Sequence, residues 1–286
     1  MSFDEIPRTY RSTIAASWKP EAVYAIRYAT RPTALRHEHF YGHDECGDVS
    51  MPIDYFVWLV TGPDSAILLD GGFTPATADA RPGRIHLGSP LEVAETLGYG
   101  PSAIRSVVVS HAHYDHTGYL SYLPQARIHL QEKELSFWTG PSARREMYRS
   151  IVDQEDILGL VRSNFDGSLD LYHGDAWIAP GVSVHLVGGH TPGTQIMRVT
   201  LDSGDVVVLA SDASHFFENF NDERPFSIAH TVPDMFSAFD TIKALARRVD
   251  GSPGIIVPGH DPAVKDHFLC PRPDDESLTG RLWQIA

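Results

Sequence analysis

The chain has 286 residues, of which 42% are hydrophobic and 21% charged, a composition typical of a folded globular protein and not of a disordered one. Its 37 acidic residues against 23 Lys and Arg give a formal net charge of −14. This charge disfavours nucleic acid and anionic membranes as partners, because both need a basic surface. Two cysteines exclude a disulfide framework. The first twenty residues hold no apolar signal-peptide core and no apolar run is long enough for a membrane span, so we expect a soluble, cytoplasmic protein.

The N-terminal segment, residues 1–52, has the least regular pattern, and we expect an irregular arm there. Within it, His37, His39 and His43 lie among glycines and aromatic residues, which predicts a loop that forms a pocket wall or contacts a partner. The spacing of these histidines, two and then four residues, gives no mechanical reason for a metal site. The aromatic surface of the arm leads us to expect a homodimer.

From residue 53 onwards, short apolar runs alternate with helical patterns. The predicted strands are Tyr55–Val60, Ala66–Leu69, Ile104–Val109, Arg127–Leu130, Val182–Val187, Ile196–Leu201, Val206–Leu209 and Ile255–Val257. The predicted helices are Ser89–Leu97, Gln131–Thr139, Ser142–Leu160 and Asp234–Val249. A glycine-containing loop over residues 61–65 predicts a hairpin, which excludes a purely parallel sheet. We therefore expect one α/β domain over residues 1–286, built as a four-layer αββα sandwich of two mixed sheets.

The strongest chemical signal is the sequence SHAHYDH over residues 110–116, directly after a predicted strand. Three histidines and one aspartate fall within six residues, and an irregular turn at the end of a strand lets them converge. Imidazole suits zinc, iron, nickel and copper, and a carboxylate adds a harder ligand. The absence of a neighbouring cysteine argues against a structural zinc site.

Three more residues of ligand type, His190, Asp212 and His260, each follow a predicted strand and lie beside small residues. Strand ends at one edge of a sheet meet in space, so four segments can bring seven side chains to one place. The neighbouring glycines allow close backbone approach. Asp70 follows the strand Ala66–Leu69 in the same way, and we weigh two roles for it: orienting a ligand histidine, or closing the turn before two glycines.

This set, in this order along the chain, resembles the metallo-β-lactamase-fold superfamily. The segment Asp212–Phe220 with Arg224–Phe226 is similar to the corresponding region of the N-acyl homoserine lactonases. The resemblance covers roughly residues 55–263. It implies the αββα fold and a hydrolase that opens a lactone ring, either an N-acyl homoserine lactone or another lactone.

The resemblance also implies a dinuclear centre with two divalent cations, zinc first, with iron, manganese or cobalt as alternatives. Carried over residue by residue, the implied ligands are His111, His113 and His190 for one metal, Asp115, His116 and His260 for the other, and Asp212 as the bridge. A hydroxide shared by the two ions, its pKa lowered from about 15.7 towards 7, attacks the ring carbonyl. Asp115 is the implied proton shuttle.

One position departs from the family pattern: the lactonases carry a tyrosine three residues after the bridging aspartate, where this chain has His215. An imidazole can also donate a hydrogen bond or a proton to substrate, with a pKa of about 6.5, so we predict a catalytic role for His215. The change weakens N-acyl homoserine lactones as the substrate and favours a different lactone, cyclic ester or cyclic amide.

Four other functions are less consistent with the sequence. A glyoxalase II-like thioesterase shares the histidine motif but needs a basic pocket, and no Lys/Arg cluster lies near the late strands. Di-iron redox relatives carry glutamate where this chain has His113. A nuclease is disfavoured by the net charge. Binding proteins without catalysis tend to lose ligands, and all seven are present here.

Overall fold

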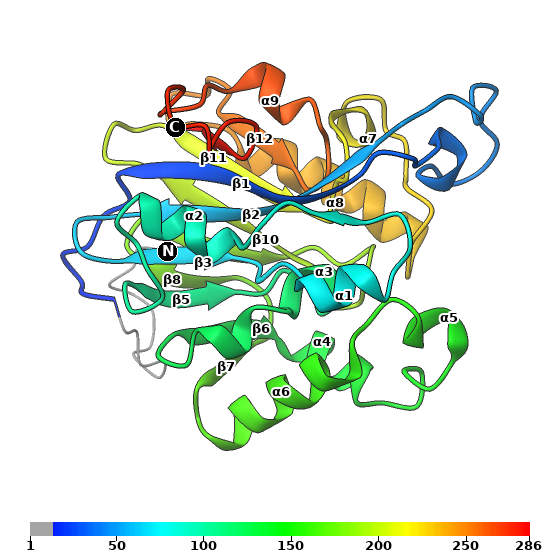
Figure 1. Ribbon diagram of the computed structural model, residues 1–286, viewed down its shortest axis with the longest axis horizontal. Helices are drawn as coiled ribbons and strands as arrows, with labels where there is room; N and C mark the ends of the chain where they lie inside the picture. Colours follow the sequence, from blue (N-terminus) through cyan, green and yellow to red (C-terminus); the bar gives the residue numbers. More distant parts are fainter. Residues whose placement is uncertain (1–13) are drawn as a thin grey trace.

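The computed structural model describes residues 14–286, which form two β-sheets packed face to face with helices on both outer faces (Figure 1). The strands of the first sheet are β1 (Ala22–Arg31), β2 (Ile53–Thr61), β3 (Ala66–Leu69), β4 (Ile85–His86), β5 (Ile104–Val108), β6 (Arg127–Gln131), β7 (Leu169–Tyr172) and β13 (Leu282–Gln284). The strands of the second sheet are β8 (Ala176–Ala179), β9 (Val182–Leu186), β10 (Gln195–Thr200), β11 (Val206–Ser211) and β12 (Ile255–Pro258).

The helices are short apart from two. They are α1 (Pro75–Asp79), α2 (Pro90–Thr96), α3 (Tyr114–Thr117), α4 (Glu132–Trp138), α5 (Glu146–Arg149), α6 (Gln154–Phe165), α7 (Phe217–Asn221), α8 (Val232–Leu245) and α9 (Val264–His267). None of the helices in the described residues is both long and apolar enough to cross a membrane.

Both sheets are mixed, as the sequence predicted. In the first sheet β1, β2 and β3 pair antiparallel, and β3, β5, β6 and β7 pair parallel. In the second, β8 to β11 pair antiparallel and β12 lies parallel to β11. The order along the second sheet, β12-β11-β10-β9-β8, makes β9, β11 and β12 run in the same direction. Their carboxyl ends therefore reach the same edge.

The hydrophobic core lies in three places: between the two sheets, between the first sheet and its helices, and between the second sheet and α8. Between the sheets, Trp58 and Leu69 of the first sheet pack with Val184 and Leu209 of the second. The outer face of the first sheet is covered by α2, α4 and α6, and that of the second by α8, whose Ile242 packs against the sheet. The αββα prediction is confirmed.

Strand β1 lies inside the segment for which the sequence predicted irregular structure, so that prediction is wrong for residues 22–31. Its three alanines are weak strand formers, and they obscure the signal of Tyr24, Ile26 and Tyr28. Pairing with β2 on one edge and with β13 and β4 on the other holds the strand in place. Residues 1–13 of the predicted arm lie outside the described residues.

The predicted helix over residues 142–160 is broken into α5 and α6. Asp153 ends the break by capping α6: its side chain accepts a hydrogen bond from the backbone N–H of Glu155 at 2.9 Å. The non-helical carbonyls at the break are used elsewhere, since that of Ile151 accepts from the N–H of Tyr114 at 3.1 Å. The break thus joins this segment to the histidine motif.

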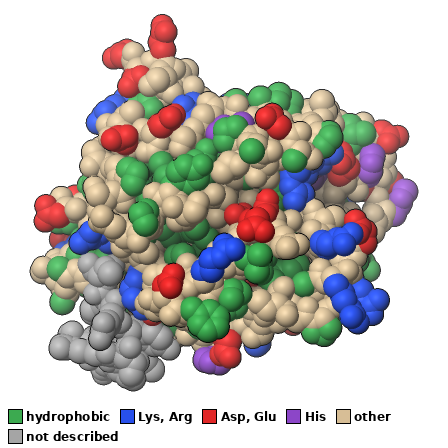
Figure 2. Space-filling model, turned by 60° about the horizontal axis from the view of Figure 1, so that its bottom comes forward, with side chains coloured by type: hydrophobic (Ala, Val, Ile, Leu, Met, Phe, Trp, Pro, Cys, Tyr) green, Lys and Arg blue, Asp and Glu red, His purple; other side chains and the backbone are tan. Residues whose placement is uncertain are grey.

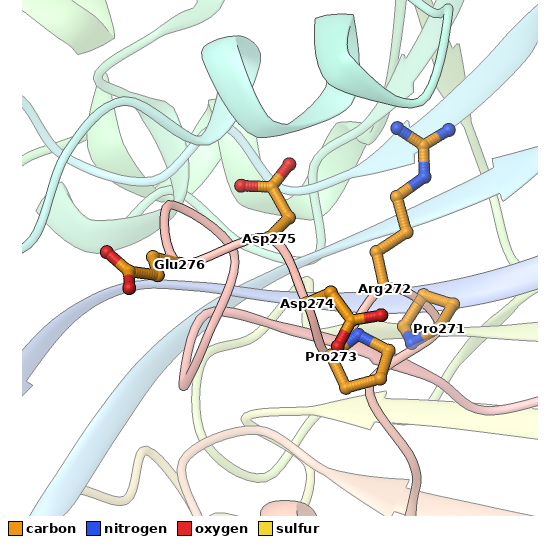
Figure 3. A pocket seen from close by; sticks show the side chains of 6 residues that line it. All are labelled: Pro271, Arg272, Pro273, Asp274, Asp275 and Glu276. Carbon is orange, nitrogen blue, oxygen red and sulfur yellow. The ribbon is translucent and has the colours of Figure 1, made fainter.

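The C-terminal loop before β13 packs beside α2. It lines a hollow at residues 271–276, where Figure 3 shows Arg272 and Asp275 pointing toward that helix. Arg272 donates to the carbonyl of Thr96 at the end of α2 at 2.8 Å, and Asp275 accepts from the N–H of Ser277 at 3.0 Å. Arg272 thus holds the loop against α2, while Asp275 stabilises the turn of the loop itself. Among the described residues on the face in Figure 2, acidic and basic side chains are interspersed.

Candidate metal centre

The seven predicted ligands come together at one edge of the sandwich, where strands of both sheets end. His111 follows β5, His190 follows β9, Asp212 follows β11 and His260 follows β12. In Figure 1 this edge lies near α3, between the extended segment at residues 32–51 and the segment that carries α5. Parallel strand direction in each sheet explains the convergence, as expected from the sequence.

The first group is His111, His113 and His190, all buried. Nε2 of His190 lies 3.1 Å from Nε2 of His111 and 2.9 Å from Nδ1 of His113. The other ring nitrogen of His190 donates to the carbonyl of Ile228 at 2.7 Å, which leaves a lone pair on Nε2 in the neutral ring. Three imidazole nitrogens facing one point could hold a metal ion.

The second group is Asp115, His116 and His260, also buried. Nε2 of His116 lies 3.6 Å from Oδ1 of Asp115, and Nε2 of His260 lies 3.7 Å from Oδ2 of Asp115. Nδ1 of His260 donates to the carbonyl of Asp54 at 2.8 Å, so its Nε2 is directed inward. This group mixes imidazole with a carboxylate, which suits the same borderline cations.

Asp212 lies between the two groups. Its Oδ2 is 3.4 Å from Nε2 of His190, and its Oδ1 is 3.1 Å from Nε2 of His260. The backbone of the β12 end passes directly beside this carboxylate, because a Cβ at Gly259 would lie 2.8 Å from Oδ1 of Asp212. This contact explains why a glycine precedes His260.

The charge states of the first group and of Asp212 suit cation binding, whereas in His116 and His260 burial is outweighed by nearby carboxylates, which raise the pKa. Burial lowers the pKa of His190 to about 3 despite the nearby Asp212, and burial with neighbouring histidines lowers the pKa of His111 and His113 well below the usual value. These rings are therefore neutral ligands at pH 7. Burial opposes ionisation of Asp212, but His260, His215 and His116 outweigh it and lower its pKa well below the usual range.

Asp70 contacts His116, one of the predicted ligands, which favours the first of the two roles weighed for it. Its Oδ2 lies 2.8 Å from Nδ1 of His116. The same carboxylate accepts from the N–H of Ser110 at 2.7 Å and from Oγ of Ser211 at 2.8 Å, which ties β3, β5 and β11 together. Both Asp70 (φ 68°) and Ser211 (φ 44°) adopt left-handed backbone, a strained state that these hydrogen bonds hold.

Sequence reasoning missed Glu134, a fully buried carboxylate in α4. It accepts hydrogen bonds from the N–H of Ala112 at 2.9 Å, from Nε1 of Trp138 at 2.5 Å, from Oγ1 of Thr191 at 2.6 Å and from the N–H of Gly193 at 3.0 Å. Glu134 thus joins the loop of His111 and His113 to the loop of His190. Nothing in the pattern of α4 distinguishes this glutamate from its neighbours.

His215 lies beside Asp212, and its catalytic role stays a prediction. Its Nε2 is 3.0 Å from Oδ2 of Asp212, and its ring stacks on Phe226 with centroids 3.9 Å apart. Burial lowers the pKa of His215, against the opposing effect of Asp212. His190, Asp212 and His215 also form a group that could hold a metal, so the geometry allows His215 to act on substrate or as a ligand.

A cavity of about 270 Å³ opens onto the cluster, with Asp115, His190, Asp212, His215 and His260 in its wall. His39 is part of this wall: it is buried, and its Nε2 lies 2.8 Å from the carbonyl of Met51. The exposed His37 and His43 are not in the wall. The wall also contains three arginines that the sequence did not place there, Arg31, Arg81 and Arg84.

Unpaired buried atoms in the cluster also indicate that these residues could hold a metal ion. Nε2 of His116 and Oδ1 of Asp212 are buried without a hydrogen-bond partner. An unpaired buried polar atom costs about 1–3 kcal/mol, and a cation between these atoms satisfies both. The cluster therefore has the donors and the unpaired atoms that a metal centre needs.

Comparison with known proteins agrees with this geometry. The model of the Metallo-beta-lactamase superfamily matches residues 52–260, and the chain belongs to that superfamily. The chain is 28% identical over 239 residues to the N-acyl homoserine lactonase AttM of Azorhizobium caulinodans, covering 77% of this chain and 86% of the relative. It is 29% identical over 201 residues to the N-acyl homoserine lactonase AiiA of Bacillus thuringiensis subsp. kurstaki, covering 70% and 73%.

Solved structures show the same fold. A quorum-quenching N-acyl homoserine lactone lactonase superposes with a TM-score of 0.70 at 22% identity, over 87% of this chain and 95% of the other. AidC, a dizinc quorum-quenching lactonase in complex with a product, superposes with a TM-score of 0.64 at 17% identity, over 85% and 89%.

Proposed function

We propose that this chain is a metal-dependent hydrolase that opens lactone rings at a dinuclear centre. The observation that carries the proposal is the buried cluster itself, in which Asp212 faces two separate groups of three ligands at the base of a cavity. Relatives named N-acyl homoserine lactonase support the lactone as the substrate class. Zinc is the ion we propose first, because imidazole and carboxylate donors suit it and AidC is a dizinc enzyme.

In this proposal, His111, His113 and His190 would hold one cation, and Asp115, His116 and His260 would hold the other, with Asp212 lying between the two groups. Two such cations would lower the pKa of a bound water and polarise an ester carbonyl. The protein supplies the remaining chemistry. The cavity wall places the ring beside the cluster, and Asp115, at the cavity surface, moves the proton from the attacking water to the leaving oxygen. His215 donates a hydrogen bond to the substrate oxygen from its stacked position on Phe226.

The test combines metal analysis with a substrate panel. Purified protein expressed with added zinc should hold close to two metals per chain, and Asp212→Ala should lower that content. The panel contains short- and long-chain N-acyl homoserine lactones, simple γ- and δ-lactones and an aromatic lactone, followed with a pH indicator. A metal content near zero, or two metals with no turnover of any lactone, contradicts the proposal.

A glyoxalase II-like thioesterase is the second candidate, and one observation favours it. The arginines in the cavity wall supply the basic surface whose absence near the late strands argued against this function. They come from residues 31–84, early in the chain and far in sequence from the late strands. S-lactoylglutathione belongs in the same panel, and its turnover in preference to every lactone decides for the thioesterase.

A further inference from the structure

We propose that the cavity selects a substrate that carries a carboxylate in addition to its scissile ester, and that Arg81 and Arg84 bind that carboxylate. This inference rests on the proposed hydrolase function and narrows its substrate class. The charge of the cavity wall is opposite in sign to the net charge of the whole chain.

Outside the metal cluster, the ionised side chains of the wall are three arginines and one glutamate, Glu38. Three positive charges against one negative leave a local excess of two positive charges, on a chain whose formal net charge is −14. Two divalent cations in the cluster add further positive charge. A cavity with this field attracts and orients anions.

The charges of Arg81 and Arg84 are left without a carboxylate partner in the described part of the chain. The ion pair in the wall joins Arg31 to Glu38. Arg81 donates to the carbonyls of Ser150 at 2.7 Å and Val152 at 3.1 Å, and Arg84 donates to the hydroxyl of Tyr114 at 3.3 Å and the carbonyl of Pro82 at 3.0 Å. These acceptors are neutral. They fix each guanidinium in place and leave its charge available to a ligand.

The placement of the two arginines relative to the cluster is also fixed. The guanidinium carbon of Arg81 lies 3.9 Å from the centre of the Tyr114 ring, and that of Arg84 lies 5.8 Å from it. Tyr114 precedes Asp115, and its hydroxyl lies 3.3 Å from that of Tyr55, whose ring packs edge-on against His260. The guanidinium groups of Arg81 and Arg84 are therefore separated from the predicted metal ligands by the rings of Tyr114 and Tyr55. A substrate bound there has its anionic group a few bonds away from the carbonyl under attack.

A carboxylate is the group that a planar guanidinium binds best, through two parallel charge-assisted hydrogen bonds. An N-acyl chain offers no charge to these arginines. The tyrosine-to-histidine change at position 215 and the arginine pair thus both point away from a neutral N-acyl homoserine lactone, and they are independent features of the site.

The experiment compares two lactones of equal size on the metal-loaded enzyme: 5-oxotetrahydrofuran-2-carboxylate and the corresponding neutral carboxamide. We expect kcat/KM to be at least about tenfold higher for the carboxylate, with the preference shrinking as salt is raised. Arg81→Gln and Arg84→Gln should each lower the carboxylate-to-carboxamide ratio about tenfold or more. Arg149→Gln is the matched control, since Arg149 is an exposed arginine of α5 outside the cavity wall, and it should leave the ratio unchanged.

Glu38→Gln should change the carboxylate-to-carboxamide ratio in the opposite direction. This variant tests the proposal even if an arginine variant does not fold. It keeps an oxygen that can accept the 2.8 Å hydrogen bond from the N–H of Leu35 but frees Arg31 from its ion pair, so the ratio should rise. Equal turnover of the two lactones, with a ratio that no variant moves, overturns the carboxylate proposal and leaves the lactonase function standing. No turnover of either lactone or of the wider panel, with two metals bound, overturns the proposed function itself.

Discussion

The carboxylate of Glu134 accepts a hydrogen bond from the hydroxyl of Thr191 at 2.6 Å and so connects α4 to the loop of His190. The same carboxylate holds the N–H of Ala112, between His111 and His113. Three histidines from two loops therefore depend on one buried glutamate for their relative position.

Glu134→Gln should destabilise the protein and weaken metal binding. The carboxylate of Glu134 accepts from four donors, and the NH2 group of glutamine cannot accept from any of them. At least one hydrogen bond is therefore lost in a buried site. We expect the free energy of unfolding to fall by about 2–4 kcal/mol, measured by chemical denaturation. Glu132→Gln, two residues earlier on the same helix, removes a partly exposed carboxylate and should change stability by less than about 1 kcal/mol.

Gly193→Ala tests the same contact from the other side. A Cβ at Gly193 would lie 2.5 Å from the backbone N of Glu134 and 2.7 Å from its Oε2, closer than any relaxed contact. The loop of His190 must move away from α4, and zinc affinity should fall with it. Unchanged zinc affinity in both Gly193→Ala and Glu134→Gln would show that the two loops hold their positions without this link.

Asp70→Asn should lower metal affinity while the fold is kept. The carboxylate contacts Nδ1 of His116, so it orients that ring and makes it a more basic ligand. Asparagine is of the same size but carries no charge. We expect affinity to fall by about 10–100-fold, measured by competition with a chromogenic chelator. A value within twofold of the wild type would remove Asp70 from the metal centre.

The part of the site that follows strand ends could be predicted from the sequence, because a β-branched run followed by glycine and a ligand residue is visible locally. His190 and His260 have this form, and Asp212 follows its strand after Ala210 and Ser211, two other small residues. Glu134, Arg81 and Arg84 could not be found in this way, since their roles come from contacts with residues far along the chain. Strand β1 was missed for a related reason: its alanines are strand residues only because sheet partners on both edges fix them.

His215→Ala distinguishes the two roles that the geometry allows for His215. If the ring acts on substrate, kcat should fall about 10²-fold or more while metal content stays normal. If the ring is a metal ligand, metal content falls in parallel with activity. His215→Tyr is the companion variant, since it restores the residue type of the lactonase pattern, and it should retain more activity than the alanine variant. Normal kcat in His215→Ala would exclude both roles.

Asp156 predicts a pH dependence that is separate from the metal centre. Burial raises its pKa from 3.8 to about 6, and a hydrogen bond from Oγ1 of Thr117 at 2.8 Å only partly opposes the shift. Between these two pKa values the folded protein binds more protons than the unfolded chain, so the free energy of unfolding falls as the pH rises through this window. Asp156→Asn removes the buried charge and keeps an acceptor for Thr117.

We therefore expect Asp156→Asn to raise the free energy of unfolding by about 1–2 kcal/mol at pH 8 and to change it little at pH 4. Urea unfolding of the metal-free protein at both pH values measures this without a contribution from metal loss. Glu155→Gln is the control: its carboxylate is exposed in the same turn of α6, so it should show no gain that depends on pH. A contribution from the charge of Asp156 must vanish at pH 4, where the folded protein holds this carboxyl protonated. An equal gain at both pH values for Asp156→Asn would therefore mean that the effect comes from packing.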